Sequence, residues 1–494
     1  MFSIIIASDH IKISNLDIFR MVRLEIFHSM LTYSFTNLGS DSLYEHLYKC
    51  IKNDILQSVL SPGEKLPSKR SFAKNLGIST ITVENAYAQL MAEGYVYSIP
   101  KKGFFVADIK SQEPAATSIL SSENVQLSSG KSSYIADFTS NQAKQEQFPF
   151  SIWAKLIRQL LNENQVDLLT NPPSGGILPL RKAIAGHLLA FRGMHVEPEQ
   201  IIIGAGTEYL YGLLLQLLGM DKHYGIEDPG YHKIYQIYQS HQVSCSYVTM
   251  DKDGVQISDL EQAGIDVVHL SPSHHFPTGI VMPISRRYEI LGWASKSPNR
   301  YIIEDDYDSE FRLTGQPIPP LQSIDVLEKV IYMNTFTKTL ASTVRISYMV
   351  LPKHLVNTFY EKLSFYSCTV SNFEQYTLAH FISEGYFEKH LNRMRNYYHN
   401  KRDFLLQSIR NSPLAQYATI SEEDAGLHFL LKLKTSYSDT EFRQRMEQRG
   451  VRLSALSQYY EHAPESAEHV FIINYSSLSE ESITKAIELL YEAL

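Results

Sequence analysis

The first ordered pattern of apolar and polar positions lies within residues 41–110. Leu43, Leu47, Ile51 and Ile55 stand four residues apart in DSLYEHLYKCIKNDIL, as expected for one face of an amphipathic helix. The stretch SPGEKLPS then breaks the pattern, because proline and glycine are poor helix formers. Two further helical segments, KRSFAKNL and TITVENAYAQLMAEG, follow, and after them two β-rich runs, YVYSI and GFFVA, flank a tight basic turn.

The helix boundaries in this segment carry residues typical of caps. Ser68 can accept a hydrogen bond at the start of KRSFAKNL, and Gly77 can end that helix. Ser79 can cap the next helix, which Gly94 ends. Three helices followed by a β-hairpin predict a winged helix-turn-helix domain over residues 41–110.

Residues 111–134, SQEPAATSILSSENVQLSSGKSSY, hold no sustained period and are rich in Ser, Gln, Pro and Ala, which predicts a flexible linker. Residues 1–40 are expected to form an N-terminal extension. Met30 is a sensible start just ahead of the first predicted helix, so we hypothesise that residues 1–29 are upstream codons or a dispensable extension. A native peptide from this region would end that hypothesis.

From residue 135 to residue 494 the pattern changes to helices alternating with short apolar strands. These strands are not polar on alternate positions, which is typical of a parallel sheet covered on both faces. The fold class predicted here is α/β, with a large doubly wound domain. The last hundred residues, where HFLLKL and VFIINY stand between helices, predict a smaller α/β subdomain. The predicted strand segments of the larger part are EQIIIGAG, YGIED, VSCSYVTM, DVVHLSP, RYIIEDDY, VIYMNTFTK and ISYMVLP.

Composition narrows the class of protein. The 494 residues are 44% hydrophobic and 20% charged, as in globular proteins, and no apolar run reaches the roughly 18 residues that span a bilayer. The net charge of −8 argues against coating of nucleic acid, yet residues 41–110 hold nine Lys and Arg against seven Asp and Glu. Cys50, Cys245 and Cys368 match no metal spacing and suit a reducing cytoplasm. No metal and no membrane partner are expected.

Polar side chains gather where a helix-turn-helix domain meets double-stranded DNA. The second helix of the motif presents its N-terminal residues to base edges in the major groove, and the wing contacts the backbone or the minor groove. An ordinary helical domain with surface lysines is the alternative. The predicted DNA-binding residues are Lys69, Arg70, Ser79, Thr80, Thr82, Asn85, Lys101, Lys102 and Gly103, the last of which lets the hairpin turn close.

Lys338, in NTFTKTLASTVRISYMVLP, has three interpretations: a surface lysine, a buried ion pair, or an amine that forms a Schiff base. In the third, the amine condenses with an aldehyde such as pyridoxal 5'-phosphate (PLP). A PLP site also needs an acid for the pyridine nitrogen, donors for the phosphate and a ring-stacking aromatic. Such groups follow in order along residues 135–494. We predict Asp305 for the nitrogen, Tyr307 for the phenolic oxygen, Gly206, Thr207, Thr335 and Arg345 for the phosphate, and Tyr231 for stacking.

The order LPSKRxxAxxLGISxxTVxxAYxxLxxEGxV…KGFFV resembles the GntR-type winged helix. Likewise GAGT, EDPGY, SPSHHFPTG, IEDDYDSEFR and TFTKTLxxTVRxxYMVLP resemble a fold-type I aminotransferase. Joined in one chain, they are similar to the MocR/GabR-type subfamily of GntR regulators. That resemblance implies PLP used as a sensor, with an external aldimine formed by an amino compound altering DNA binding. It also implies a domain-swapped, head-to-tail homodimer.

Several positions depart from the family pattern. GntR relatives usually have arginine where Thr80 stands and often another where Glu84 stands, so their operator does not carry over. Lys233 follows the His of PGYH, where GABA-sensing relatives have the arginine that grips the effector carboxylate, so Lys233 is the predicted effector contact. His275 replaces a common glutamine and is expected either to touch the ring or to pack.

The late strand AEHVFIINYSSL has His469 and lacks the usual carboxylate-binding arginine, for which Arg452 is one possible substitute. GABA is therefore not assigned as the effector. D-alanine, another small amino acid, a polyamine-derived amine and PLP itself stay open.

The function predicted is a PLP-dependent transcriptional regulator of a bacterial cytoplasm, associated with the nucleoid when bound to promoter DNA, and not primarily an enzyme. The alternatives are a working aminotransferase with a DNA-binding appendage, and a binding protein without cofactor. The DNA-binding module favours regulation, and the missing substrate arginine disfavours efficient turnover.

Overall fold

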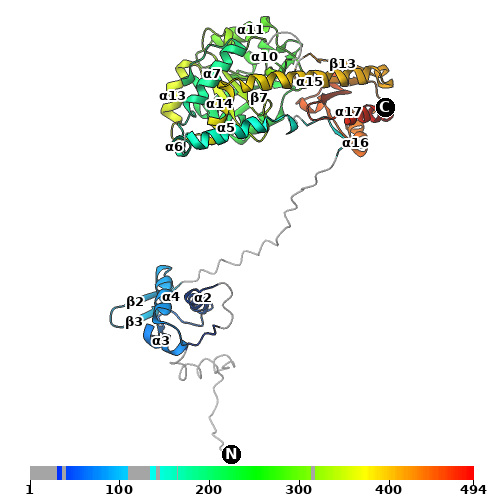
Figure 1. Cartoon of the computed structure of the whole chain (residues 1–494). Coiled ribbons are helices and arrows are strands. Elements are labelled where there is room, and N and C mark those ends of the chain that lie inside the picture. The colour runs from blue at the N-terminus through cyan, green and yellow to red at the C-terminus, as the bar shows by residue number, and fades with distance from the viewer. Residues whose placement is uncertain are drawn as a thin grey trace, which may run out of the picture. The chain divides into compact units, whose positions relative to one another are not determined.

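The protein, seen in a computed structural model, divides into two compact units, Met1–Ser129 and Gly130–Leu494. Each unit is described by itself (Figure 1). The structure describes residues 31–35, 41–109, 134–140, 145–163, 165–312, 318–424 and 426–494. The hypothesis on residues 1–29 and the predicted linker up to residue 133 lie outside these residues.

The first unit is a helix-turn-helix followed by a hairpin, as the sequence predicts. Ser68 caps α3 by accepting a 3.2 Å hydrogen bond from the amide of Ser71, and Gly77 ends that helix with a left-handed φ of 67°. The small sheet is antiparallel, in the order β1-β3-β2. The elements are α2 (Leu43–Leu56), β1 (Lys65–Leu66), α3 (Lys69–Leu76), α4 (Thr80–Ala92), β2 (Val96–Ile99) and β3 (Gly103–Val106).

The core of this unit extends beyond the residues that the pattern selects. Leu47, Ile51 and Ile55 are buried, but Leu43 is 40% exposed, because a four-residue spacing drifts around a helix of 3.6 residues per turn. Residues 31–35 pack against the same core, and the phenol of Tyr33 donates a 2.7 Å hydrogen bond to Asp54. The unit therefore includes residues that lie before the expected boundary at residue 41.

The second unit is built on an eight-stranded sheet in the order β5-β12-β11-β10-β9-β6-β7-β8. Ile201, Ile202 and Ile203 of β5 are all buried and face two different hydrophobic clusters in turn, because helices cover both faces. The strands are β5 (Ile201–Gly204), β6 (His223–Asp228), β7 (Ser244–Asp251), β8 (Gly254–Val255), β9 (Val267–Leu270), β10 (Tyr301–Asp305), β11 (Val330–Thr335) and β12 (Ser347–Val350).

This sheet is not wholly parallel, which corrects the expectation from the sequence. Strand β12 runs antiparallel to both β11 and β5, and β8 runs antiparallel to β7. Residues 336–346, which join β11 to β12, form no helix, and a parallel pair needs a longer crossover. That short connection is the segment that holds Lys338.

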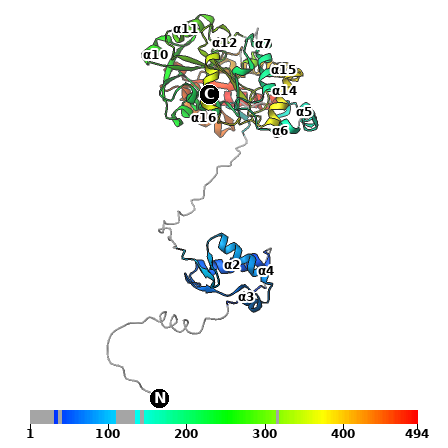
Figure 2. The same ribbon diagram turned by 90° about the vertical axis from the view of Figure 1, so that its left-hand side faces the viewer.

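Helices enclose the sheet, with α10 and α11 on the opposite side of the unit from α5, α6 and α14 (Figure 2). They are α5 (Phe150–Glu163), α6 (Gln165–Leu169), α7 (Leu178–Arg192), α8 (Thr207–Leu218), α9 (His232–Ser240), α10 (Ile257–Gln262), α11 (Ile284–Ser295), α12 (Leu321–Ile324), α13 (Lys353–Leu363) and α14 (Asn372–Ser383). Short 3-10 turns are η1 (Gln145–Gln147), η2 (Pro198–Gln200) and η3 (Ser309–Phe311).

The long helix α15 (Tyr386–Arg410) runs from this part to a smaller one (Figure 1). The smaller part has a sheet in the order β13-β14-β17-β16 and its own hydrophobic cluster. Its first strand, β4 (Ala136–Asp137), pairs in parallel with β15 (Val451–Arg452). The other elements are η4 (Pro413–Gln416), β13 (Ala418–Ser421), β14 (His428–Leu433), α16 (Asp439–Gln448), β16 (Ser454–Ala455), η5 (Leu456–Tyr459), η6 (Glu465–Ala467), β17 (Val470–Asn474) and α17 (Glu480–Ala493).

Within the described ranges, none of the helices is both long and apolar enough to cross a membrane. The same residues hold no group of three or more His, Cys, Asp or Glu side chains placed to bind a metal ion. Cys50, Cys245 and Cys368 are all free thiols.

Candidate functional site

The predicted DNA-binding face of the first unit is exposed around the start of α4. The Ser79 hydroxyl accepts a 3.1 Å hydrogen bond from the amide of Thr82, so this side chain caps the helix. Thr80 and Asn85 are exposed beside it. Ile81, which sequence reasoning missed, is 68% exposed on the same helix, where an apolar side chain can touch a thymine methyl group.

The positively charged side chains of this face differ in their contacts and exposure. Lys69 lies 2.6 Å from Glu84 of α4 and above the ring of Phe104, whereas Arg70 is exposed. Two positive backbone φ angles shape the hairpin turn, 64° at Lys101 and 117° at Gly103. The turn leaves the side chains of Lys101 and Lys102 exposed at its tip.

In the second unit, a cavity of about 360 Å³ lies where strands of the large sheet end. Its walls come from β6, β9, β10 and β11, from the first two turns of α8 and α9, and from the smaller subdomain. This edge is where open α/β sheets bind ligands. Of the predicted cofactor and effector residues, those that line the cavity are Thr207, Tyr231, Lys233, Asp305, Tyr307, Thr335, Lys338 and Arg345.

Lys338 follows the end of β11 and is partly buried. Burial lowers the pKa of its ammonium group from 10.5 to about 8, although the nearby charge of Asp308 acts in the opposite direction. A lysine with a lowered pKa has more of its neutral amine available as a nucleophile near neutral pH. Its partial burial at the cavity disfavours the interpretation of Lys338 as an ordinary surface lysine.

Asp305 ends β10 and is buried with one oxygen satisfied and the other free. Its Oδ2 accepts a 2.6 Å hydrogen bond from the phenol of Tyr211 and lies 3.5 Å from Nε2 of His269. Its Oδ1 is buried, and no described residue offers it a hydrogen bond. A buried carboxylate oxygen that lacks a donor is suited to a protonated ligand nitrogen.

The first turn of α8 contributes Thr207 and Glu208 to the cavity lining. Gly206 precedes this helix with a φ of 95°, and a Cβ atom there would lie 2.4 Å from the guanidinium of Arg345. Glycine at this position leaves room for that side chain beside the helix N-terminus, where backbone N–H groups favour anions. The hydroxyl of Thr335 accepts a 2.8 Å hydrogen bond from Ser347, which fixes its position in the same wall.

Of the remaining predicted residues, Tyr307 and Tyr231 line the cavity and His275 does not. The phenol of Tyr307 lies 3.3 Å from Nδ1 of His274, and Tyr231 is half exposed at the cavity, so its ring face is accessible. His275 does not line the cavity: it is buried, with Nδ1 2.7 Å from the Thr278 hydroxyl and Nε2 3.4 Å from Glu227. Burial lowers its pKa to about 3, so this ring is neutral and packs behind the site.

Sequence reasoning missed several cavity residues. Tyr211 and His269 hold Asp305, and the only signal for His269 is that it interrupts an otherwise apolar strand. Glu227, buried on β6, has its pKa raised to about 8 by burial. The smaller subdomain contributes a wall of uncharged side chains that no sequence motif predicted. These residues are Phe138, Thr139, Ser454, Tyr459, Ile472 and Asn474.

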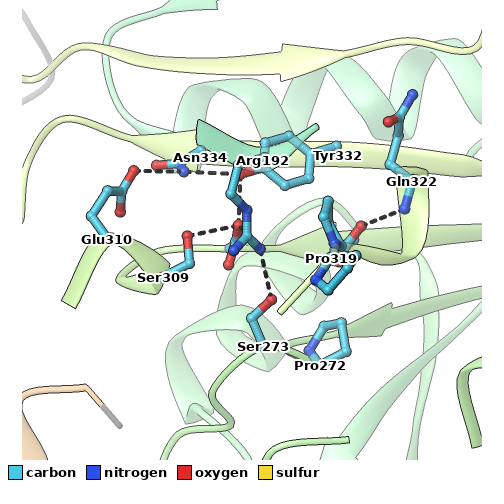
Figure 3. Close-up of polar contacts among 12 residues, drawn as sticks. Arg192, Pro272, Ser273, Ser309, Glu310, Pro319, Gln322, Tyr332 and Asn334 are labelled. Atoms are coloured by element: carbon cyan, nitrogen blue, oxygen red, sulfur yellow. Dashed lines mark hydrogen bonds and ion pairs between the residues drawn. The ribbon is translucent and has the colours of Figure 1, made fainter. Parts of the chain in front are cut away.

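A buried polar network lies directly behind β10 (Figure 3). The guanidinium of Arg192 lies 2.8 Å from Asp306 and donates a 3.1 Å hydrogen bond to Ser273. Asp306 also accepts 2.6 Å and 2.8 Å hydrogen bonds from Tyr332 and Ser309. Because Asp305 and Asp306 are neighbours, this network fixes the backbone that carries the cavity's carboxylate.

Comparison with known proteins gives consistent results. Residues 43–106 match the family described as "Bacterial regulatory proteins, gntR family". The "uncharacterized HTH-type transcriptional regulator YdeL" of Bacillus subtilis (strain 168) is 37% identical over 451 residues, which are 91% of this chain and 96% of that protein. The "probable rhizopine catabolism regulatory protein MocR" of Rhizobium meliloti is 31% identical, over 91% of this chain and 93% of that protein.

Solved structures share the fold of the second unit. The multiple substrate aminotransferase of Thermococcus profundus has a TM-score of 0.65 at 22% identity and covers 73% of this chain and 91% of that one. The kynurenine aminotransferase of Pyrococcus horikoshii has the same TM-score at 23% identity, over 74% of this chain and 91% of that one. These structures show the fold of the second unit, and the regulators YdeL and MocR, which are 37% and 31% identical to this chain over nearly their whole length, show the family. The chain belongs to the MocR type of GntR-family transcriptional regulators, in which a DNA-binding helix-turn-helix domain precedes a fold-type I aminotransferase-like domain.

Proposed function

We propose that the aminotransferase-like domain binds PLP through Lys338 and uses it to sense an amino compound. The observation that carries the proposal is the unsatisfied Oδ1 of Asp305, a residue that lines the same cavity as a lysine of lowered pKa and an arginine beside a helix N-terminus. A buried oxygen of this kind needs a donor, and a protonated pyridine nitrogen is one. When bound, PLP supplies an aldehyde that condenses reversibly with primary amines.

Each residue has a defined part in this proposal. Lys338 supplies the neutral amine, and Asp305 holds the proton at the pyridine nitrogen. Arg345 and the backbone N–H groups at the start of α8 bind the phosphate, with Thr207 and Thr335 beside them. Tyr307 holds a proton toward the phenolic oxygen, because burial raises the pKa of its phenol well above the usual value. The half-exposed ring of Tyr231 is the proposed stacking partner.

A sensor, and not an efficient aminotransferase, is the function that the cavity favours. Arg345 is the one arginine lining the cavity in the described part of the chain, and in this proposal it binds the phosphate of PLP. Arg452 does not line the cavity, because its guanidinium lies 3.7 Å from Asp137 and above the ring of Tyr134. A substrate α-carboxylate therefore lacks the bidentate partner that transaminases use, whereas an amine can still enter and replace the Lys338 amine.

A homodimer is part of the proposal. Four large apolar side chains of α5 and α6 and one of α14 are exposed, and these three helices contact one another. A second copy of this chain would bury that surface, and we propose that it does so in the head-to-tail, domain-swapped arrangement of the family. These residues are Phe150, Leu161, Val166, Leu169 and Phe373. The protein would act in the cytoplasm, on promoter DNA.

Reductive trapping tests the cofactor assignment. Borohydride treatment of the purified protein should add the mass of the reduced cofactor to the peptide that contains Lys338, and Lys338→Ala should remain folded without that label. Amino compounds should then change the absorbance of the wild-type protein and its affinity for promoter DNA together. A label that persists in Lys338→Ala would overturn the proposal. So would an affinity for promoter DNA that stays constant whenever an amino compound changes the cofactor absorbance. Sustained turnover once a keto acid is added would instead favour the aminotransferase alternative.

A further inference from the structure

At the cavity, one carboxylate pairs with two positively charged side chains. The carboxylate of Glu208, in the first turn of α8, forms an ion pair with the amine of Lys233. The other oxygen of the same carboxylate lies 3.6 Å from the guanidinium of Arg345. The hydrogen bond from Lys233 lowers the pKa of Glu208, so the carboxylate is ionised at neutral pH. All three side chains line the cavity.

This pairing leaves little positive charge for a ligand carboxylate. In the proposed function the phosphate takes Arg345, and Glu208 then keeps only Lys233 as its partner. Lys233, which the sequence predicts as the contact for an effector carboxylate, is thereby already paired with an anion. An effector carboxylate would have to displace Glu208 and would lie near two anionic groups, an arrangement that Coulomb repulsion disfavours.

The opposite wall offers no replacement cation. It consists of the neutral side chains of the smaller subdomain, among which Thr139, Ser454 and Asn474 provide hydroxyl and amide groups. His469, which stands near the place of the family arginine, does not line the cavity; its Nδ1 lies 3.9 Å from Asp439. Among the described residues, this wall can therefore hydrogen-bond a hydroxyl or an amine but holds no charge to balance a carboxylate.

We propose that the effector is a primary amine that carries a hydroxyl or a second amine in place of a carboxylate, and that Glu208 sets this specificity. The inference rests on the proposed function, because the reacting amine needs the cofactor. Within that function, it names the chemical class of the effector and one residue that selects it. Glu208 acts by its charge at the cavity and by holding Lys233.

Three amines of equal chain length provide the test: δ-hydroxybutylamine, putrescine and γ-aminobutyrate. Each is titrated against the cofactor absorbance of the dimer as purified, and its reactivity toward free PLP is divided out. All three react with free PLP at sufficient concentration, so each gives a value. The wild type should bind the first two at least about tenfold more tightly than γ-aminobutyrate, and Glu208→Gln should remove most of that difference.

A matched control separates the local charge from net charge. Glu261→Gln opens the exposed Lys296–Glu261 pair, whose atoms lie 2.6 Å apart away from the cavity, and should leave the discrimination unchanged. The apoprotein gives a second readout: Glu208→Gln should bind inorganic phosphate more tightly, because it removes an anion beside Arg345.

The outcomes distinguish the two proposals. Equal binding of γ-aminobutyrate and the other two amines in the wild type, or discrimination that survives Glu208→Gln, overturns the inference and leaves the cofactor assignment standing. A wild-type protein that binds no PLP overturns the proposed function, and the inference with it.

Discussion

The phenol of Tyr211, on α8, donates a 2.6 Å hydrogen bond to Oδ2 of Asp305, at the end of β10. Burial and the neighbouring charge of Asp305 raise the pKa of this phenol well above its usual value, so Tyr211 stays a donor across the physiological range. Because Oδ2 is occupied in this way, Oδ1 is the oxygen that is left for a ligand. Tyr211 therefore positions the carboxylate on which the cofactor proposal depends.

Replacing Tyr211 by phenylalanine should weaken cofactor binding. The variant removes one hydrogen bond to a buried carboxylate, which is worth about 1.5–3 kcal/mol, so the dissociation constant for PLP should rise on the order of tenfold or more. Titration of the apoprotein with PLP, followed by absorbance, measures it. Tyr209→Phe, on the same helix but outside the cavity, is the matched control and should bind PLP as the wild type does. Equal affinities in Tyr211→Phe and the wild type would refute the positioning role.

The lowered pKa of Lys338 predicts the pH dependence of cofactor attachment. Only the neutral amine attacks an aldehyde, so the rate of PLP attachment to the apoprotein should rise with pH to a midpoint near 8, the value to which burial lowers this pKa. A free lysine side chain should continue to gain rate up to its ordinary value of about 10.5. The charge of Asp308 raises the pKa of Lys338, so Asp308→Asn should move the midpoint to lower pH. A midpoint that rises in Asp308→Asn would contradict this assignment.

Sequence patterns located eight of the residues that line the cavity, because several of them lie at or just after the ends of apolar strands that are easy to recognise. Asp305 ends β10 and Lys338 follows β11, and the carboxyl ends of such strands meet at one edge of a sheet. The direction of β12 was missed, since local pattern does not distinguish a crossover from a short reversal.

Contacts between elements that are distant in the sequence could not be predicted, because they depend on how the helices and strands are arranged in space. Tyr211 belongs to a helix in which most residues are buried, so nothing in the pattern marks the one that points at Asp305. Glu208 has the opposite problem: an exposed glutamate in the first turn of a helix is normally explained by the helix dipole. Its contacts with Lys233 and Arg345 follow only from the arrangement of α8, α9 and the segment after β11.

In the DNA-binding domain, Glu84→Gln should strengthen binding to DNA. Glu84 holds Lys69 at 2.6 Å on the face that carries the predicted contacts, so the variant removes an anion and frees a cation. The slope of log affinity against log salt concentration should steepen by about one counterion. Fluorescence anisotropy with a nonspecific duplex at several salt concentrations measures both quantities.

A matched variant controls for the loss of a glutamate in that experiment. Glu93→Gln opens the 2.8 Å Lys52–Glu93 pair at the other end of α4 and should change DNA affinity much less. An unchanged salt slope in Glu84→Gln would show that Lys69 does not reach a phosphate.

The network behind β10 predicts a pH-dependent contribution to stability. Burial, and then the charge of Asp306, raise the pKa of Glu310 to about 7. One oxygen of Glu310 accepts a 3.2 Å hydrogen bond from Asn334, and the other has no partner among the described residues (Figure 3). The folded protein therefore binds this proton more strongly than the unfolded chain does, so the stabilising contribution is complete below about 4.5 and is lost as the pH rises through 7.

Glu310→Gln should abolish this pH dependence, because an amide does not ionise. Relative to the wild type, the variant should gain on the order of 2 kcal/mol in free energy of unfolding between pH 5 and pH 8. Urea unfolding followed by tryptophan fluorescence measures it, since Trp153 and Trp293 both lie in the second unit. Glu199→Gln, which changes an exposed glutamate of the same unit, should track the wild type at both pH values. If the free energy of unfolding of Glu310→Gln and of the wild type changes with pH in parallel, the titration belongs to another group. If only Glu310→Gln gains stability relative to the wild type between pH 5 and pH 8, the network behind the cofactor carboxylate holds a proton at neutral pH.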